Sequence, residues 1–330
     1  MTSFLRSLSP DQQVSLLFVL VFGLLTLASG IRLALSMRER KGNQTTAIDV
    51  PSHGLRNFHG LLRTSWLMAI VFWLGWAAGN GVATVLFALV SFFILREFIS
   101  LSPTRRGDHR SLLLAFFVVL PLQYWLVWHE RFDLFTVFIP VYVFLALPTL
   151  SALGNDPQRF LARNAKLQWG IMVCVYGMSH VPALLFLEFP NGAGKTAFLV
   201  FFLVFVVQTS TLVQHLVSKR FSRPVAPAIS ESFNWRGWAI GLLVGGLLGA
   251  ALAGFTPFKP LPAMAMALVA SAAGSFGHLV MKAIKRDRGV TYWGSAGQSI
   301  TGASGLLDRV DALCFAAPVF FHSVRWKFGL

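Results

Sequence analysis

The sequence has 330 residues, of which 55% are hydrophobic and only 12% are charged. A soluble domain carries about 25% charged residues, so this composition excludes an ordinary water-soluble protein. A net charge of +15 would favour nucleic-acid binding in a soluble chain. In a membrane protein Lys and Arg instead retain loops on the cytoplasmic side, so we expect the lipid bilayer and no nucleic acid as a partner.

Apolar residues come in long blocks and not in stripes, which predicts an all-α, polytopic membrane protein with about ten transmembrane helices and short loops. In chain order these spans cover residues at about 14–36, 64–78, 81–98, 111–128, 133–152, 168–187, 196–217, 237–255, 261–284 and 310–325. We expect residues 1–330 to form a single integral membrane domain. Within it, 1–200 are amino-terminal helices of scaffold type, and 201–330 hold the candidate site.

The basic residues predict an orientation for these spans. With the amino terminus outside, the predicted cytoplasmic segments hold all Lys and Arg residues except Arg6, Arg131, Lys195, Lys259, Arg325 and Lys327. This asymmetry indicates a multi-pass protein of the inner, cytoplasmic membrane. The stretch "GNDPQRFLARNAKLQ" is then expected to be a surface connector on the cytoplasmic side.

Two features inside the spans favour structural roles. The eighth span contains "GLLVGGLLGAALAG", whose small residues predict close helix packing. The sixth contains His180, and a buried His in a span is a functional hypothesis by default. Because Ser179 and nearby carbonyls could satisfy its ring, a structural role for His180 is favoured over a chemical one.

The end of the ninth span, "GHLVMKAIKRDRGVTYWGS", is rich in basic side chains. On a helix His278 and Lys282 are neighbours at positions i and i+4, and Lys285 and Arg286 follow on adjoining faces. One interpretation is a snorkelling basic end that binds lipid headgroups. The other is a cradle for a polyphosphate, and position alone does not separate the two.

The stretch "ITGASGLLDRVDALCF" places two of the chain's 13 acids together. Asp308 and Asp311 are three residues apart, so a helix presents both carboxylates on one face. Mg²⁺ is commonly held by one or two carboxylates together with substrate phosphates. The Gly-rich turn lets backbone approach a ligand, and Arg309 can donate to phosphate. The alternative is an ordinary helix start with acids in its first turn.

The run "KRDRGV…WG…ITGASGLLDRVDALCFAAPVFF" resembles the carboxy-terminal signature of the phosphatidate cytidylyltransferases, the CDP-diacylglycerol synthases. That signature reads Ser, two residues, Lys-Arg, a short spacer, Lys-Asp, Pro-Gly-His-Gly-Gly, two residues, Asp-Arg, one residue, Asp. The multi-span layout, with "FIPV" in the fifth span and "SH" in the sixth, extends a weaker similarity over most of the chain. We therefore identify the chain as a divergent member of this family.

This sequence departs from the family pattern at several positions, namely Thr211, Phe233, Arg236, His278, Lys282, Thr291, Tyr292, Thr301, Ala303 and Ser304. Among them His278 stands where relatives carry an acid, and Lys282 where many carry Ser. The positions that agree with the signature include Gly302, Gly305, Asp308, Arg309 and Asp311. Fewer carboxylates are thus available for metal binding than in the family pattern.

The resemblance implies transfer of CMP from CTP to phosphatidic acid, which gives CDP-diacylglycerol and pyrophosphate in phospholipid biosynthesis. Asp308 and Asp311 would bind Mg²⁺, and Arg309 would join them as a catalytic residue. The implied phosphate- or nucleotide-binding residues are Lys282, Lys285, Arg286, Gly302, Gly305 and His278.

An alternative is a catalytically degraded family member that acts as a lipid-binding scaffold or regulator, because a two-metal site usually needs more than two acids. The enzyme and the scaffold both stay open at this point. A transporter is disfavoured because no inverted repeat is evident. The sequence also leaves open a homodimer.

Overall fold

The computed structural model describes residues 77–330, with gaps at 102–104, 190–195, 222, 291–292 and 294–304, and scattered helical positions between residues 12 and 74. This described part is α-helical, and its β-type pairing is limited to an isolated bridge between Ala226 and Ser230. Of the predicted spans at 14–36 and 64–78 the structure describes only scattered positions, nearly all of them helical. The count of ten spans is therefore not confirmed.

Seven segments of the described chain are long and apolar enough to cross a membrane. They are Asn80–Ser100, His109–Trp128, Phe132–Ala152, Phe160–Phe186, Thr196–Ser218, Trp235–Phe255 and Pro260–Asp287. Each corresponds to one of the third to ninth predicted spans, which confirms the all-α polytopic architecture. The agreement has a physical reason: in a bilayer every backbone polar group must be satisfied within the segment, so apolar blocks of this length become helices.

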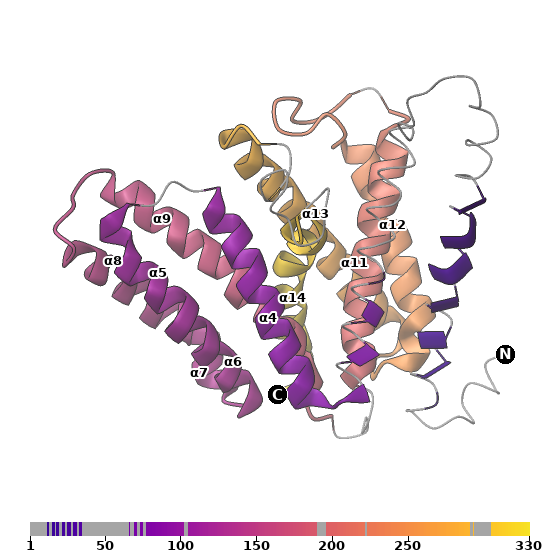
Figure 1. Ribbon diagram of the computed structural model, residues 1–330. Helices are drawn as coiled ribbons and strands as arrows, with labels where there is room; N and C mark the ends of the chain where they lie inside the picture. Colours follow the sequence, from indigo (N-terminus) through magenta and orange to yellow (C-terminus); the bar gives the residue numbers. More distant parts are fainter. Residues whose placement is uncertain are drawn as a thin grey trace.

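The seven segments comprise the following helices (Figure 1). The first is α4 (Asn80–Ser100); the second runs from α5 (His109–Leu114) through the π-helical turn η2 (Ala115–Val119) into α6 (Leu120–Trp128). The third runs from α7 (Phe132–Val137) through η3 (Phe138–Val143) into α8 (Phe144–Ala152). The fourth contains α9 (Phe160–Ile171), η4 (Met172–Gly177), α10 (Met178–Ala183) and η5 (Leu184–Phe186). The last three are α11 (Thr196–Ser218), α12 (Trp235–Ala251) with η6 (Leu252–Phe255), and α13 (Pro260–Asp287).

The fourth segment corrects one prediction. More than half of the connector expected in "GNDPQRFLARNAKLQ" is helical, because α9 begins at Phe160. Arg163 explains the early start: its Nε lies 2.9 Å from Asp108 Oδ1 and its Nη1 lies 2.8 Å from Asp156 Oδ2. These ion pairs fix the first turn of α9 against the neighbouring loops, which hydropathy alone does not reveal.

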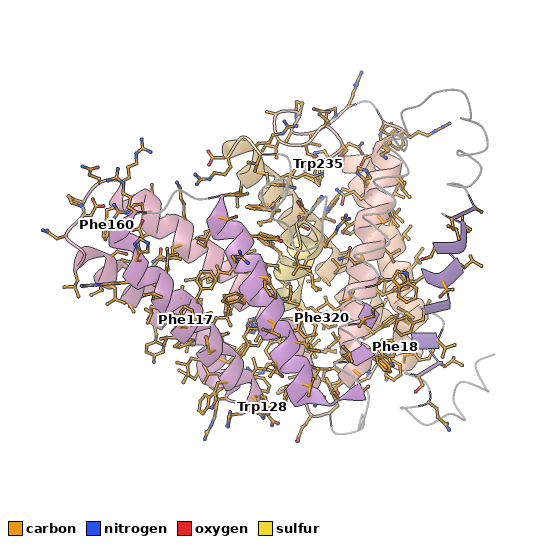
Figure 2. All side chains as sticks on the ribbon, in the orientation of Figure 1. Phe18, Phe117, Trp128, Phe160, Trp235 and Phe320 are labelled. Atoms are coloured by element: carbon orange, nitrogen blue, oxygen red, sulfur yellow. The ribbon has the colours of Figure 1, made fainter. Side chains whose placement is uncertain are left out.

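The last helix, α14 (Leu307–Phe328), is the central one of the bundle. It packs against α4, α10, η4, α11 and α13. It covers the predicted tenth span at 310–325 but is not among the seven most apolar segments, because charged residues lie near both of its ends. Its interior face is apolar: Phe320 is 1% exposed, whereas Phe117 on η2 is 68% exposed on the outside (Figure 2).

Helices α11, α12 and α13 pack closely through small residues. On α12 the glycines Gly237, Gly241, Gly245 and Gly249 recur every fourth residue and are buried. A Cβ at Gly241 would lie 2.7 Å from the Ser210 carbonyl of α11. The close packing predicted from "GLLVGGLLGAALAG" is thereby confirmed, and it joins α11, α12 and α13 into one unit that supports the candidate site.

Candidate functional site

The candidate site forms where α13 and α14 cross. At this crossing Gly277 faces Phe315, and a Cβ on Gly277 would overlap the phenyl ring. Gly274, one turn earlier, also lies close to α14: a Cβ there would be 3.2 Å from the Ala312 carbonyl oxygen, and 2.7 Å from Val207 of α11. The absence of side chains at these two glycines lets the helices approach closely, so that the polar residues that follow Gly277 on α13 meet the first turn of α14.

Two acid–base pairs result from this approach. The ring nitrogen Nδ1 of His278 donates to Asp311 Oδ2 at 2.7 Å, and the ammonium of Lys285 lies 2.5 Å from Asp308 Oδ1. We call His278, Lys282, Lys285, Asp308 and Asp311 the aspartate cluster. In the structure the two aspartates thus contact basic residues near the end of the ninth predicted span.

Burial makes these contacts significant. Asp311 is 2% exposed and Lys285 is 9% exposed. Burial raises the pKa of the Asp308 carboxyl, while the Lys285 ammonium and the Trp293 N–H act in the opposite direction. A buried charge without a partner is costly, so each pair holds its two helices in a defined register.

Lys282 differs from the other basic residues of the cluster because it takes part in none of the ion pairs among the described residues. Its Nζ donates to Ser230 Oγ at 3.3 Å, from the loop that connects α11 to α12. His215 lies in the last turn of α11, the helix from which this loop leaves. Sequence reasoning missed His215, although its position at the end of an apolar span is a usable signal. Lys282 is thus a cation of the cluster that pairs with neither aspartate.

Glu97, near the end of α4, is a second residue that sequence reasoning missed. Its Oε1 accepts from the N–H of Leu306 and its Oε2 from the N–H of Leu307, both at 2.9 Å. These N–H groups begin α14, so the carboxylate caps the helix that carries Asp308. Gly305 permits the contact, since a Cβ there would lie 2.7 Å from Glu97 Oε2. An acid inside an apolar span is the signal that could have identified it.

Trp293 connects this cap to the cluster. Its backbone N–H donates to Asp308 Oδ2 at 2.9 Å, and its ring stacks on Phe98 with a centroid distance of 5.4 Å. The Trp293 side chain is 1% exposed. Asp308 is therefore held by contacts from α13, from the segment after α13 and, through the start of α14, from α4.

The remaining predicted site residues fall in three places. Gly305 is next to the cap, and the backbone carbonyl of Arg309 accepts from Gln208 Nε2 of α11 at 3.1 Å. Arg286 points away from the cluster: its guanidinium is 59% exposed and lies 3.6 Å from Glu231. Gly302 lies outside the described residues. Adjacent positions on a helix point about 100° apart, which explains why Lys285 enters the cluster and Arg286 does not.

His180 lies elsewhere, inside the bundle and fully buried. Its Nδ1 donates to the Tyr176 carbonyl at 2.7 Å, and its ring packs against Phe135 and Phe321. These contacts suit the structural role that the sequence favoured.

The donor set of the cluster can be compared with what Mg²⁺ requires. Mg²⁺ prefers oxygen ligands and often takes only one or two carboxylates. Asp308 and Asp311 have four carboxylate oxygens, and each oxygen already accepts one hydrogen bond. Three of the donors are described above, and the remaining one is the Ala312 N–H, which lies 2.7 Å from Asp311 Oδ1. A carboxylate oxygen retains a second lone pair, so each of the two side chains keeps acceptor capacity for a metal ion. The part of the chain that the structure describes contains no group of three acids, His or Cys that would bind metal without substrate.

Fold and cluster together define a polytopic helical membrane protein with buried acid–base pairs at one end of its bundle. Sequence comparison specifies the class further: the pattern of the cytidylyltransferase family matches residues 61–326. A protein of Escherichia coli (strain K12), named uncharacterized protein YnbB, is 34% identical over 315 residues, which is 93% of this chain and 96% of that protein. The chain belongs to the cytidylyltransferase family.

Proposed function

We propose that this protein transfers CMP from CTP to phosphatidic acid and releases pyrophosphate, so that CDP-diacylglycerol remains in the bilayer. The observation that carries the proposal is the aspartate cluster, in which two aspartates and a lysine that pairs with neither of them meet at the ends of apolar helices. Membership of the cytidylyltransferase family supports a reaction that uses CTP. The basic residues support a placement of the cluster on the cytoplasmic side of the inner membrane, where CTP is available.

The proposed reaction assigns tasks to three residues of the aspartate cluster. A phosphate oxygen of phosphatidic acid attacks the α-phosphorus of CTP, and the bond to the β-phosphate oxygen breaks as pyrophosphate leaves. Such transfers depend on positioning and on charge neutralisation, and no covalent protein nucleophile is needed. Lys282 would bind the lipid phosphate, and Asp308 and Asp311 would hold Mg²⁺. When bound, Mg²⁺ would neutralise negative charge on the phosphate oxygens.

The test is formation of CDP-diacylglycerol by purified protein from labelled CTP, phosphatidic acid and Mg²⁺. We expect Asp308→Asn and Asp311→Asn each to lower the rate by about 100-fold or more, since a carboxylate ligand of the metal is lost. Lys327→Gln removes an exposed charge from the far end of α14 and is the matched control, with an unchanged rate. Equal rates in the control and in both aspartate variants would refute the assigned roles.

A catalytically inactive lipid-binding scaffold is the second candidate. One observation favours it: every carboxylate oxygen of the cluster already accepts a hydrogen bond. The same assay separates the candidates. Wild-type protein that binds phosphatidic acid but forms no CDP-diacylglycerol with Mg²⁺ would support the scaffold and contradict the enzyme.

A further inference from the structure

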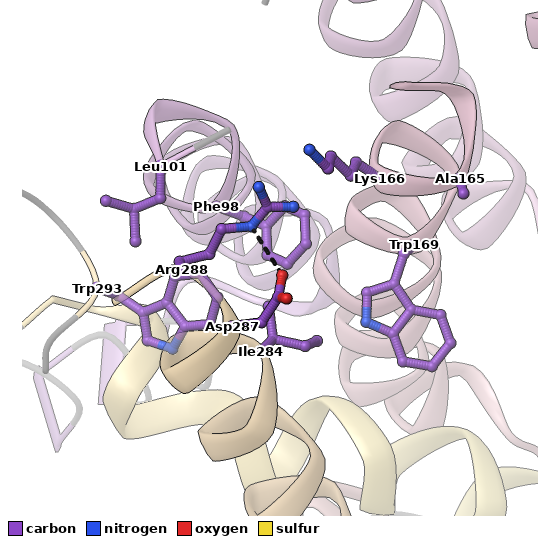
Figure 3. A pocket seen from close by; sticks show the side chains of 9 residues that line it. All are labelled: Phe98, Leu101, Ala165, Lys166, Trp169, Ile284, Asp287, Arg288 and Trp293. Carbon is purple, nitrogen blue, oxygen red and sulfur yellow. Dashed lines mark ion pairs between the residues drawn. The ribbon is translucent and has the colours of Figure 1, made fainter. Parts of the chain in front are cut away.

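A cleft lies next to the aspartate cluster, between the carboxy-terminal ends of α4 and α13 and the second half of α9 (Figure 3). We call it the Trp169 cleft. Its volume is about 270 Å³, and its walls include the apolar side chains of Phe98, Trp169, Ile284 and Trp293. Ligand pockets for whole small molecules commonly occupy about 300–1,000 Å³, so this cleft suits one part of a larger amphiphile.

Two cations face each other across the Trp169 cleft. In Figure 3, Lys166 from α9 and Arg288 from the end of α13 point toward one another. Arg288 has only a loose partner: its Nε is 3.5 Å from Asp287 Oδ2, and the Asp287 side chain is 75% exposed. Lys166 takes part in none of the ion pairs among the described residues. The charges of Lys166, Arg288 and Asp287 sum to one net positive charge in the cleft. An anion between the two cations would relieve their repulsion.

The combination of walls and charges indicates the kind of anion. A soluble anion is strongly hydrated and gains little from apolar walls, whereas a phospholipid presents a phosphate beside hydrocarbon. Basic pockets between transmembrane helices on one side of a membrane are typical sites for anionic headgroups. Trp169, which is 42% exposed, is the type of aromatic side chain that lies at the level of the headgroups.

We propose that the Trp169 cleft binds an anionic phospholipid, with its phosphate between Lys166 and Arg288 and the start of one acyl chain along Phe98, Trp169 and Ile284. Trp293 also lines the cleft, and its backbone N–H holds Asp308. The inference does not depend on the proposed function, because none of the aspartate cluster lines the cleft.

The experiment measures binding of single lipids to the full chain in detergent by native mass spectrometry. The probes are phosphatidylglycerol, which is anionic but is not a substrate of the proposed reaction, and zwitterionic phosphatidylcholine. We expect wild type to prefer phosphatidylglycerol. The double variant Lys166→Gln/Arg288→Gln should bind it about 30-fold more weakly, since each basic residue contributes about 1 kcal/mol and about 1.4 kcal/mol is tenfold.

Two further variants separate charge from shape. Ala165→Trp fills the cleft from an exposed position of α9 without changing its charge, and we expect the same preference to be lost. Lys327→Gln removes a distant charge and should retain it. The proposal is overturned if the double variant or Ala165→Trp still prefers phosphatidylglycerol, or if millimolar CTP or inorganic phosphate displaces the lipid. Loss of CDP-diacylglycerol synthesis alone would bear on the proposed function and not on the cleft.

Discussion

Replacing Glu97 by alanine would leave the N–H groups of Leu306 and Leu307 without their acceptor at the start of α14. Loss of a side-chain cap costs about 1–2 kcal/mol, and a single hydrogen bond to a charged acceptor contributes about 1.5–3 kcal/mol. Two such bonds are lost here, and Glu97 is 9% exposed, so little water can replace them. We expect the free energy of unfolding to fall by about 2–4 kcal/mol.

The effect should concentrate at one place in the chain. Hydrogen exchange followed by mass spectrometry would report on the amides at 306 and 307, which should exchange about 30-fold faster or more for a local loss of about 2 kcal/mol. Glu97→Gln keeps one acceptor oxygen and should have an intermediate effect. Glu231→Ala removes an acid that is 85% exposed and should change stability by about 0.5 kcal/mol at most.

The capping argument fails if these amides keep their wild-type exchange rates in Glu97→Ala. It also fails if Glu97→Ala and Glu231→Ala unfold at the same denaturant concentration. An effect spread evenly over all helices would indicate a general packing defect and would likewise contradict a local cap.

Two more predictions concern the helices that form the cluster. Lys285→Met would leave the Asp308 carboxylate without its ammonium and should lower stability in detergent by about 2–4 kcal/mol, because an unpaired buried charge is costly. The double variant with Asp308→Leu should recover most of this loss, and no recovery would contradict the pairing. Gly277→Ala should cost about 1–3 kcal/mol because the new methyl group overlaps Phe315. Gly254→Ala, which has nothing within 4 Å of the new Cβ, is its control, and equal melting temperatures of the two would refute the tight crossing.

The sequence by itself determined the helical membrane architecture. The third to ninth predicted spans are present as helices, because hydrocarbon forces each apolar block to satisfy its own backbone hydrogen bonds. It also placed Asp308 and Asp311 on one helical face, since their spacing depends only on the period of the helix. The small-residue pattern of α12 was informative for a similar reason: close packing needs small side chains wherever it occurs.

Only the tertiary structure decided which groups meet. Glu97 reaches Leu306 across 209 residues of sequence, and no local pattern links an acid at the end of one apolar block to the start of another helix. The same holds for Arg163, whose ion pairs start α9 earlier than hydropathy indicated. Lys285 and Arg286 are adjacent basic residues that the sequence does not distinguish. In the structure Lys285 pairs with Asp308, whereas Arg286 faces solvent. Hydropathy is a property of single segments, whereas the partners of a buried charge depend on how the helices rotate and cross when they pack.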